Sequence, residues 1–311
     1  MKQSKIDAYR LTEEGLLQKF DLERKEHFIQ VNGHSTRVRV QEIGTGDPLL
    51  LLHGGPNAGS TWLELVSRLS SFRCLILDRP GCGLSGGYSY GGITLDKMED
   101  LIVTVIDAVL DHFSLEKSNV LASSFGGYWA IRYALIRPEK VQKMVLEGAP
   151  ALVEDSSIPS FMKSVGNPLL RWLIPKLPGS VSSSEQTMKE LGHGYSIENG
   201  KIADFFMDWY VSLWNNTDTI KHDFDIISKV VRKGRQNPEF ILYDSEIEKL
   251  KSRTLWLWGK DDSFAGSEIA RRITSKLPDA ILVEFENSGH LPWLDNPEDH
   301  ASLIREFLSE S

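Results

Sequence analysis

The sequence predicts an α/β protein with a mostly parallel sheet, helices flanking that sheet and one helical insertion. Short apolar runs alternate with helical patterns along most of the chain, as expected when strands are covered by helices on both faces. The alternation stops between residues 151 and 240 and then resumes. At 311 residues, 41% of them hydrophobic and 25% charged, the chain is long enough to bury a core of its own.

Residues 1–27 are expected to form an N-terminal helical extension. Apolar side chains recur along this segment at helical spacing, and we expect that face to pack on the surface of the domain. These side chains are Tyr9, Leu16, Leu17 and Phe20.

The α/β core is expected in two parts, residues 28–150 and 241–311, on either side of the insertion. Two strands open the first part, and Asn32-Gly33 between them is a type I′ hairpin signal. The other expected strands are short, apolar and separated by helices. The expected strands are 27–31, 36–43, 49–52, 74–77, 120–122, 141–147, 254–258 and 281–283, with helices at about 60–70, 95–113, 126–137, 266–277 and 298–309.

The insertion, residues 151–240, is expected to be a helical cap. Prolines interrupt its first part, and helical patterns rich in aromatic residues follow. The aromatic residues indicate a hydrophobic substrate, although packing among the cap helices explains them equally well. They include Phe205, Phe206, Trp209, Tyr210 and Trp214.

Charge and composition exclude several classes of function. The net charge is −8 and no block of Lys or Arg is present, so we expect no nucleic-acid partner. No signal peptide and no apolar run of about 18 residues is visible, which predicts a cytoplasmic protein with no membrane partner. The two cysteines, Cys74 and Cys82, lack metal-ligand spacing and are expected to be reduced thiols.

Two glycine-rich patterns near residue 85 match known motifs, one for a nucleophilic serine and one for nucleotide binding, but neither has the structural context that its motif requires. Gly83-Leu84-Ser85-Gly86-Gly87 matches G-x-S-x-G, but a nucleophilic serine needs a strand before it and a helix directly after it, and Ser85 has loop on both sides. Residues 81–86 match G-x-G-x-x-G, yet no helix opens at the last glycine, so we expect no nucleotide cofactor.

Ser124 is the expected nucleophile. It lies between an apolar strand and a helical pattern that begins directly after it. Strand and helix approach closely at such a turn, so the residues two before and two after the nucleophile must be small. These residues are Ala122 and Gly126 for Ser124, whereas the neighbouring Ser123 would place Leu121 and Phe125 there.

His290 is the expected base, because a serine hydroxyl needs one nearby. Only His290 and His300 follow the last expected strand. His300 lies in a charged helical pattern, where a solvated surface histidine is expected. His290 lies in a loop just past the strand, where parallel sheets place their chemistry. The acid is expected one strand earlier, at Asp262 or the adjacent Asp261, with Glu147 as a third candidate.

The loop His53-Gly54-Gly55-Pro56 follows the strand 49–52. At this place an α/β sheet with a nucleophilic serine takes one N–H for the oxyanion from the loop and one from the residue after the serine. The expected oxyanion donors are therefore Gly55 and Phe125. We expect His53 to stabilise the loop rather than to react.

These segments, in this order over residues 28–311, resemble the capped α/β-hydrolase superfamily. The resemblance implies an acid at Asp262, as in a G-x-x-D turn, and no metal or organic cofactor. It departs from the usual pattern at Ala122, where glycine is common. The matching segments are Leu52-His53-Gly54-Gly55-Pro56, Asp78-Arg79-Pro80-Gly81-Cys82-Gly83-Leu84-Ser85, Ser123-Ser124-Phe125-Gly126-Gly127, Trp258-Gly259-Lys260-Asp261-Asp262 and Ser288-Gly289-His290.

The resemblance implies a serine hydrolase that acts on a small, hydrophobic molecule, with an ester as the expected substrate. Prolyl iminopeptidases share two of the segments but carry tryptophan after the nucleophile, where this chain has Phe125. The Ser-x-Gly-Gly turn is closer to esterases and to carbon–carbon bond hydrolases. A ligand-sensing receptor, a lyase and an acyl transferase remain alternatives on the same fold, and the oligomeric state is not predicted.

Overall fold

The computed structural model describes residues 1–310 and contains an eight-stranded sheet in the order β1-β2-β4-β3-β5-β6-β9-β10. The pairs β1–β2 and β2–β4 are antiparallel, and every other neighbouring pair is parallel. The predicted fold class is confirmed. The strands are β1 (Arg24–Val31), β2 (Thr36–Ile43), β3 (Asp47–Leu52), β4 (Phe72–Asp78), β5 (Ser118–Ser123), β6 (Val141–Glu147), β9 (Arg253–Gly259) and β10 (Ala280–Phe285).

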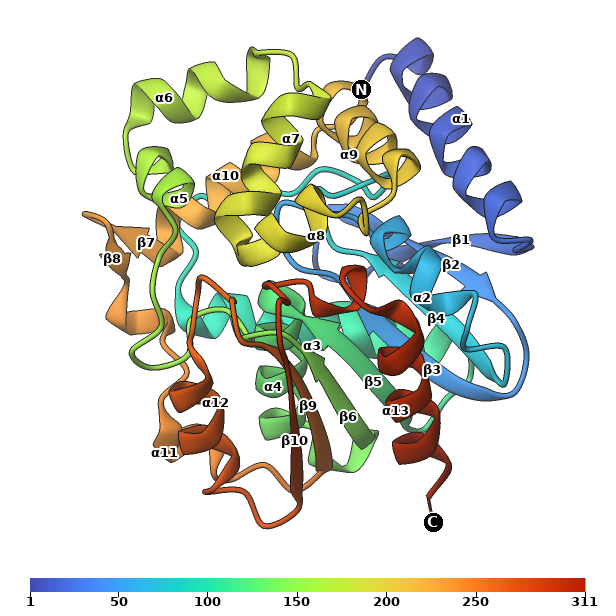
Figure 1. The fold of residues 1–311 in the computed structure, drawn as a ribbon, viewed down its shortest axis with the longest axis vertical. Coiled ribbons are helices and arrows are strands. Elements are labelled where there is room, and N and C mark those ends of the chain that lie inside the picture. Colours follow the sequence, from blue (N-terminus) through green and yellow to red (C-terminus); the bar gives the residue numbers. More distant parts are fainter. Residues whose placement is uncertain (311) are drawn as a thin grey trace.

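Helices cover both faces of the sheet, with α3, α4, α11 and α12 on one face and α2 and α13 on the other (Figure 1). Strand β5 is completely buried, and β9 is buried from Thr254 onward, which explains their continuous apolar runs in the sequence. These helices are α2 (Leu63–Val66), α3 (Leu95–His112), α4 (Ser124–Ile136), α11 (Asp244–Ile247), α12 (Ser267–Thr274) and α13 (Pro297–Ser309).

A helical segment separates β6 from β9 along the chain, and Figure 1 shows its helices gathered at one end of the sheet. It ends in a small two-stranded ribbon, β7 (Val231–Arg232) and β8 (Arg235–Gln236). No helix within residues 1–310 is long and apolar enough to cross a bilayer. The inserted helices are α5 (Ser160–Val165), α6 (Pro168–Leu173), α7 (Val181–Met188), α8 (Gly194–Glu198), α9 (Asp204–Asn216) and α10 (Thr219–Val230).

The turn between β1 and β2 differs from the expected type I′ hairpin. Val31 pairs with Thr36, so the turn contains four residues rather than two. A type I′ turn needs a positive φ at both central residues. Gly33 has a φ of 77°, but Asn32 is not among the residues with positive φ, so the prediction of a type I′ turn is wrong.

The N-terminal helix α1 (Gln3–Lys19) packs on helix α9 of the inserted segment as well as on the core. Trp209 Nε1 donates a hydrogen bond to the Tyr9 hydroxyl at 3.3 Å. The Phe20 and Phe205 rings meet edge to face at 5.3 Å. Helix α1 therefore connects the first part of the chain to the insertion, an arrangement that its apolar stripe alone does not predict.

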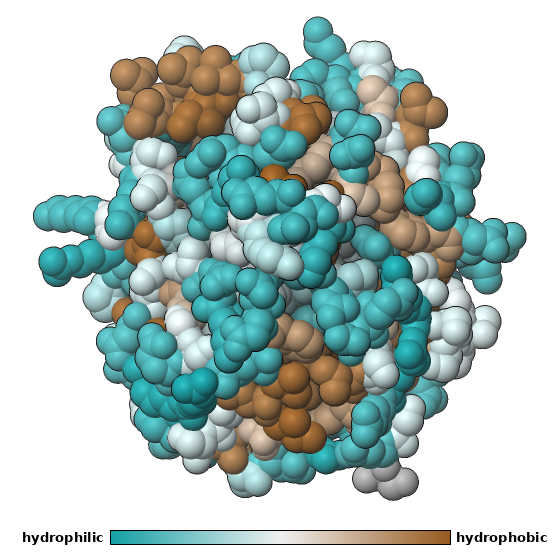
Figure 2. Space-filling view, in the orientation of Figure 1, coloured by the Kyte–Doolittle hydropathy of each residue, from teal (hydrophilic) through white to brown (hydrophobic). Residues whose placement is uncertain are grey.

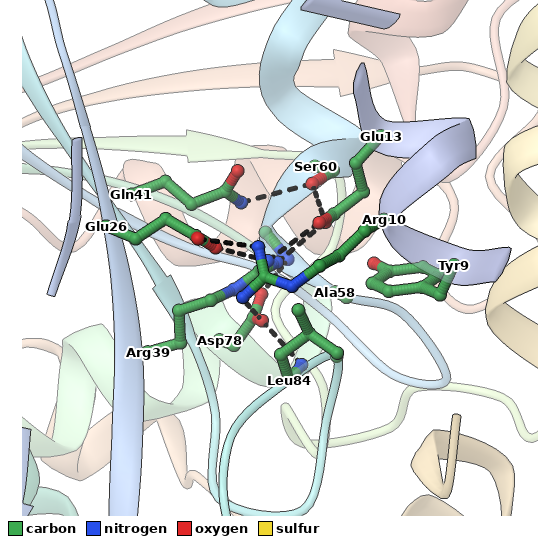
Figure 3. Close-up of polar contacts among 12 residues, drawn as sticks. Tyr9, Arg10, Glu13, Glu26, Arg39, Gln41, Ala58, Ser60, Asp78 and Leu84 are labelled. Carbon is green, nitrogen blue, oxygen red and sulfur yellow. Dashed lines mark hydrogen bonds and ion pairs between the residues drawn. The ribbon is translucent and has the colours of Figure 1, made fainter. Parts of the chain in front are cut away.

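A buried ion network also fastens α1 to the sheet, as Figure 3 shows. Both carboxylate oxygens of Glu13 accept hydrogen bonds from the Arg39 guanidinium, at 2.6 and 2.7 Å. Arg39 Nε donates to Asp78, and Ser60 donates to Glu13. Burial opposes ionisation of Glu13, but Arg39 outweighs it and lowers the Glu13 pKa to about 2. Residues of α1, β2 and β4 thus meet at one guanidinium, and Ser60 bonds to Glu13 beside it.

Candidate active site

Ser124 lies at the sharp turn between β5 and α4, with a φ of 52°. A positive φ is uncommon for a residue other than glycine and marks a turn that the surrounding structure holds in place. A Cβ on Gly126 would lie 2.1 Å from the Leu52 carbonyl oxygen, and one on Gly54 would lie 2.8 Å from the Ser124 Cβ. The close approach expected from the sequence is therefore present at Gly126, and Gly54 also lies close to Ser124.

Ser85 has a structural hydrogen-bonding role. Its hydroxyl accepts a hydrogen bond from the Arg39 N–H at 2.8 Å and donates one to the Asp78 carbonyl at 2.6 Å. A Cβ on Gly83 would lie 2.1 Å from the Asp78 carboxylate. The glycine-rich loop is thus wrapped around Asp78, and no helix opens at its end.

The structure pairs His290 with Asp262. His290 Nδ1 lies 2.9 and 3.0 Å from the two carboxylate oxygens, so Nδ1 carries the proton and donates it. The same oxygens accept backbone hydrogen bonds from Ala149 and Phe264, both at 2.9 Å. The Phe264 ring stacks on the imidazole at 4.1 Å. The position and tautomer of the imidazole are therefore set from several directions.

Neither alternative acid faces His290. Asp261 is exposed, and Glu147 binds a different histidine, His300. The expectation that His300 is a solvated surface residue is wrong: it is completely buried, bonded to Glu147 and stacked on Phe285. Its position four residues before Ile304, on the buried face of α13, could have shown this.

His290 Nε2 is buried and has no hydrogen-bond partner among the described residues, so it makes no hydrogen bond to Ser124. In structures without substrate, catalytic hydrogen bonds are often long and shorten only in the complex. The segment after β6 contacts both partners. Ala151 N–H donates to the Ser124 carbonyl at 2.9 Å, and Gly148 lies against the His290 carbonyl.

Arg79 and His53 orient the loop that contains Gly55. The Gly54 carbonyl accepts hydrogen bonds from Arg79 Nη2 at 2.8 Å and His53 Nδ1 at 2.6 Å. His53 Nε2 accepts from the Arg79 N–H, and burial together with the Arg79 charge keeps the His53 pKa well below its usual value. The Gly54 carbonyl and the Gly55 N–H belong to one peptide group, and in a trans peptide they point in opposite directions. Because the carbonyl is held toward Arg79, the Gly55 N–H points away from Arg79.

Asp223 of α10 pairs with Arg79 and was not found by the sequence analysis. Arg79 Nη2 lies 3.1 and 3.2 Å from the two carboxylate oxygens, and both side chains are buried. Burial raises the pKa of Asp223, and Arg79 opposes that shift. An acid in an amphipathic helix carries no sequence signal of a partner 144 residues away. The pair joins the inserted segment to the loop of Gly55.

A second connection from the inserted segment holds the loop of His290. The His290 N–H donates to the Leu191 carbonyl at 2.9 Å, and the Leu291 N–H donates to His193 Nε2 at 3.1 Å. His193 Nδ1 in turn donates to Asp295, which also accepts from the Gly289 N–H. Neither His193 nor Asp295 was predicted from the sequence, because a lone His and a lone Asp carry no local signal of a partner 102 residues away.

Ser124 opens into a cavity between the sheet and the inserted segment. Its wall is mainly apolar, and among the lining residues that the structure describes Asp223, already paired with Arg79, is the one charged side chain. The cavity also contains both expected oxyanion donors. Its lining is Gly55, Ser124, Phe125, Ala151, Leu152, Ser156, Ser157, Ile158, Met162, Asp223, Ile226, Ile227, Val230, Val231, Gln236 and Phe264.

The aromatic residues for which the sequence left substrate contact and packing both open do not line this cavity. Phe206 stacks on Tyr210, whose hydroxyl donates to the Pro56 carbonyl at 3.2 Å. Trp209 contacts Tyr9, and Trp214 packs edge to face on Phe224. Of the two explanations for these residues, packing is the one that these contacts match, both within the insertion and against α1 and the core.

Within residues 1–310, no group of three or more His, Cys, Asp or Glu side chains is placed to hold a metal ion. Cys74 and Cys82 are buried and free.

Comparison with known proteins relates the chain to hydrolases. It is 26% identical over 287 residues to a 2-hydroxy-6-oxononadienedioate/2-hydroxy-6-oxononatrienedioate hydrolase of Paraburkholderia phymatum, covering 89% of this chain and 93% of the relative. A 2-hydroxy-6-oxo-6-phenylhexa-2,4-dienoate hydrolase of Burkholderia cepacia is 21% identical over 280 residues, covering 88% and 91%.

Solved structures share the fold. Carboxylesterase CesB of Bacillus subtilis has a TM-score of 0.72 at 17% identity, covering 98% of this chain and 99% of the esterase. The meta-cleavage product hydrolase CumD of Pseudomonas fluorescens has a TM-score of 0.68 at 20% identity, covering 91% and 97%. The family model described as the alpha/beta hydrolase fold matches residues 47–297. The chain therefore belongs to the α/β-hydrolase fold family and is a hydrolase.

Proposed function

We propose that this hydrolase cleaves a carboxylic ester of a small, hydrophobic molecule, with Ser124 as nucleophile, His290 as base and Asp262 as orienting acid. The observation that carries the proposal is the placement of Ser124, on a strained turn between strand and helix, at an apolar cavity whose one charged side chain is already paired. Such a cavity fits a neutral acyl group better than a charged one.

In the proposed mechanism, the Ser124 oxygen attacks the ester carbonyl while His290 Nε2 takes its proton. Asp262 keeps the proton on Nδ1 and stabilises the imidazolium that forms. The Gly55 and Phe125 N–H groups donate to the oxyanion, each contributing about 3–4 kcal/mol. His290 then protonates the departing alcohol, and water cleaves the acyl-enzyme by the same route. The insertion acts as a cap that excludes bulk water.

A carbon–carbon bond hydrolase is the second candidate, because the relatives named above carry that activity in their names. Those names describe carboxylate substrates. The described lining of the cavity includes no Lys, Arg or His to pair with a carboxylate, and Arg79 is paired with Asp223. This observation favours the neutral ester. A prolyl iminopeptidase activity has only the sequence resemblance in its support.

The test is a panel of p-nitrophenyl esters, thioesters, N-terminal proline amides and vinylogous diketones, measured as kcat/KM. We expect the highest values with esters, and a higher value with a diketone than with every ester would overturn the proposal. Labelling by a fluorophosphonate identifies the nucleophile. Ser124→Ala should abolish labelling and lower kcat by roughly a millionfold, whereas Ser123→Ala and Ser85→Ala should still be labelled.

A further inference from the structure

The inserted segment contains a stretch with an unusual distribution of charge. Residues 156–184 include Lys163, Arg171 and Lys176 but no Asp or Glu, in a chain whose net charge is −8. A positive stretch in an acidic protein is not explained by solubility, because solubility needs only net charge of either sign. It indicates attraction to something negative.

The same stretch exposes large apolar side chains on and beside α6. Leu169 is 65% exposed, Trp172 61% and Leu177 51%, and Leu170 and Leu173 are also exposed. Figure 2 shows a contiguous hydrophobic area over α6, and we call these five residues the α6 patch. Single exposed apolar residues are ordinary, but a contiguous patch marks an interaction surface.

Cations surround the α6 patch. Lys176 Nζ lies 3.2 Å from the centre of the Trp172 ring. A groove beside Trp172 is lined by Lys5, Arg171, Lys176 and Lys221. The one acid in that groove, Asp218, lies 3.6 Å from the N-terminal amine. A second groove beside Trp172 contains Asp225, which pairs with Lys229 at 3.4 Å. The apolar residues are therefore bordered mainly by cations.

We propose that the α6 patch docks on the surface of a lipid bilayer that contains anionic headgroups. Leucine and tryptophan enter the interfacial region, and the arginine and lysines contact lipid phosphates. A two-fold dimer through this patch would bring the same cations of two copies together, so charge favours lipid over a second copy. The expectation of no membrane partner came from the lack of a spanning segment, whereas this docking is peripheral.

The patch lies close to the proposed active site. Helix α5 contacts α6, and Ile158 and Met162, before and within α5, line the cavity that Ser124 opens into. An apolar substrate held in the bilayer would then have a short path to the serine. This last step depends on the proposed function, but the docking itself does not.

The test is flotation of the full-length protein with vesicles of phosphatidylcholine alone or mixed with phosphatidylglycerol. We expect binding to the mixed vesicles that weakens as salt rises. Trp172→Ser should weaken binding roughly tenfold or more, because it removes apolar area that would be buried in the bilayer on docking. Arg171→Gln and Lys176→Gln should each weaken it about fivefold.

Matched controls are Leu11→Ser, at a leucine 74% exposed on α1, and Lys251→Gln, at an exposed lysine outside the insertion. Both should bind as the wild type does. Absence of binding to the mixed vesicles, or an equal loss in the controls, would overturn the proposal. So would a dimer in sedimentation velocity that Trp172→Ser dissociates, because a second copy would then cover the patch. None of these results depends on hydrolysis.

Discussion

At the scale of single residues, the site depends on positions where no side chain fits. Gly126 is such a position, because a Cβ there would lie 2.1 Å from the Leu52 carbonyl oxygen. Gly15, also in a helix, faces open space instead. The same substitution should therefore have opposite effects at these two glycines.

We expect Gly126→Ala to lower the free energy of unfolding by at least about 2 kcal/mol, since the backbone of β3 or α4 must move. Gly15→Ala should raise it by about 0.5–1 kcal/mol, because alanine favours the helix. Urea denaturation of both variants measures the difference. Equal stability of the two variants would contradict the close packing described for Ser124.

A second test at the residue scale concerns Asp223 and the loop that contains the proposed oxyanion donor Gly55. Asp223→Asn removes the charge that pairs with Arg79, and Arg79 holds the Gly54 carbonyl. If the pair positions the Gly55 N–H, kcat should fall roughly tenfold to a hundredfold with little change in KM. The affinity for a trifluoromethyl ketone, which forms an oxyanion on Ser124, should fall by the same factor.

The matched control for Asp223→Asn is Glu246→Gln. Glu246 is the partner of the buried Arg132 at 2.6 Å and does not line the cavity. Glu246→Gln should alter stability but leave kcat unchanged. If Asp223→Asn raises KM alone, Asp223 contacts substrate and does not position the loop.

At the scale of elements, helix α1 is held by an ionised carboxylate that the fold buries. The Glu13 pKa is about 2 in the folded protein and near 4.5 when the chain is unfolded. A lowered pKa contributes stability above the unfolded value, and that stability is lost as the pH falls toward the folded value. The contribution of Glu13 should therefore decrease between pH 4.5 and pH 2.

The expected loss over that range is about 3 kcal/mol. It is measured as the free energy of unfolding by denaturant at several pH values. Glu13→Gln should remove this part of the acid dependence. Glu14→Gln is the control, because Glu14 is half-exposed and its pair with Arg24 is solvated. An identical acid dependence in both variants would show that Glu13 does not carry it.

At the scale of the whole molecule, the insertion is fastened to the core rather than hinged on it. Buried contacts reach from it to the loop of Gly55 through Asp223, to the loop of His290 through Leu191 and His193, and to α1 through Trp209. The positions of the proposed oxyanion donor Gly55 and of the proposed base His290 therefore both depend on the insertion.

This arrangement predicts that insertion and core unfold together. Thermal unfolding should show one transition, with far-UV and near-UV circular dichroism giving the same midpoint. Two midpoints, with the lower one accompanied by loss of esterase activity, would instead show that the insertion unfolds alone. The exposed α6 patch should not affect this result, since it contributes little buried area.

The sequence by itself determined the strands, the mostly parallel character of the sheet and the place of Ser124 between a strand and a helix, because these depend on short-range patterns. An apolar run of four residues needs cover on both faces, and small residues at 122 and 126 are required wherever a strand meets a helix this closely. Chain order on such a sheet placed the acid near His290 but left Asp262, Asp261 and Glu147 as candidates. The resemblance to α/β hydrolases implied Asp262, which is the residue that His290 contacts.

Only the tertiary structure decided which buried charges meet. Arg79 with Asp223, Glu13 with Arg39, His193 with Asp295 and His300 with Glu147 are each joined across at least 26 residues. A local sequence pattern predicts whether a side chain is buried. The free energy of a buried charge, however, depends on the partner with which it pairs. That partner comes from a distant element, and no periodicity in the sequence records it.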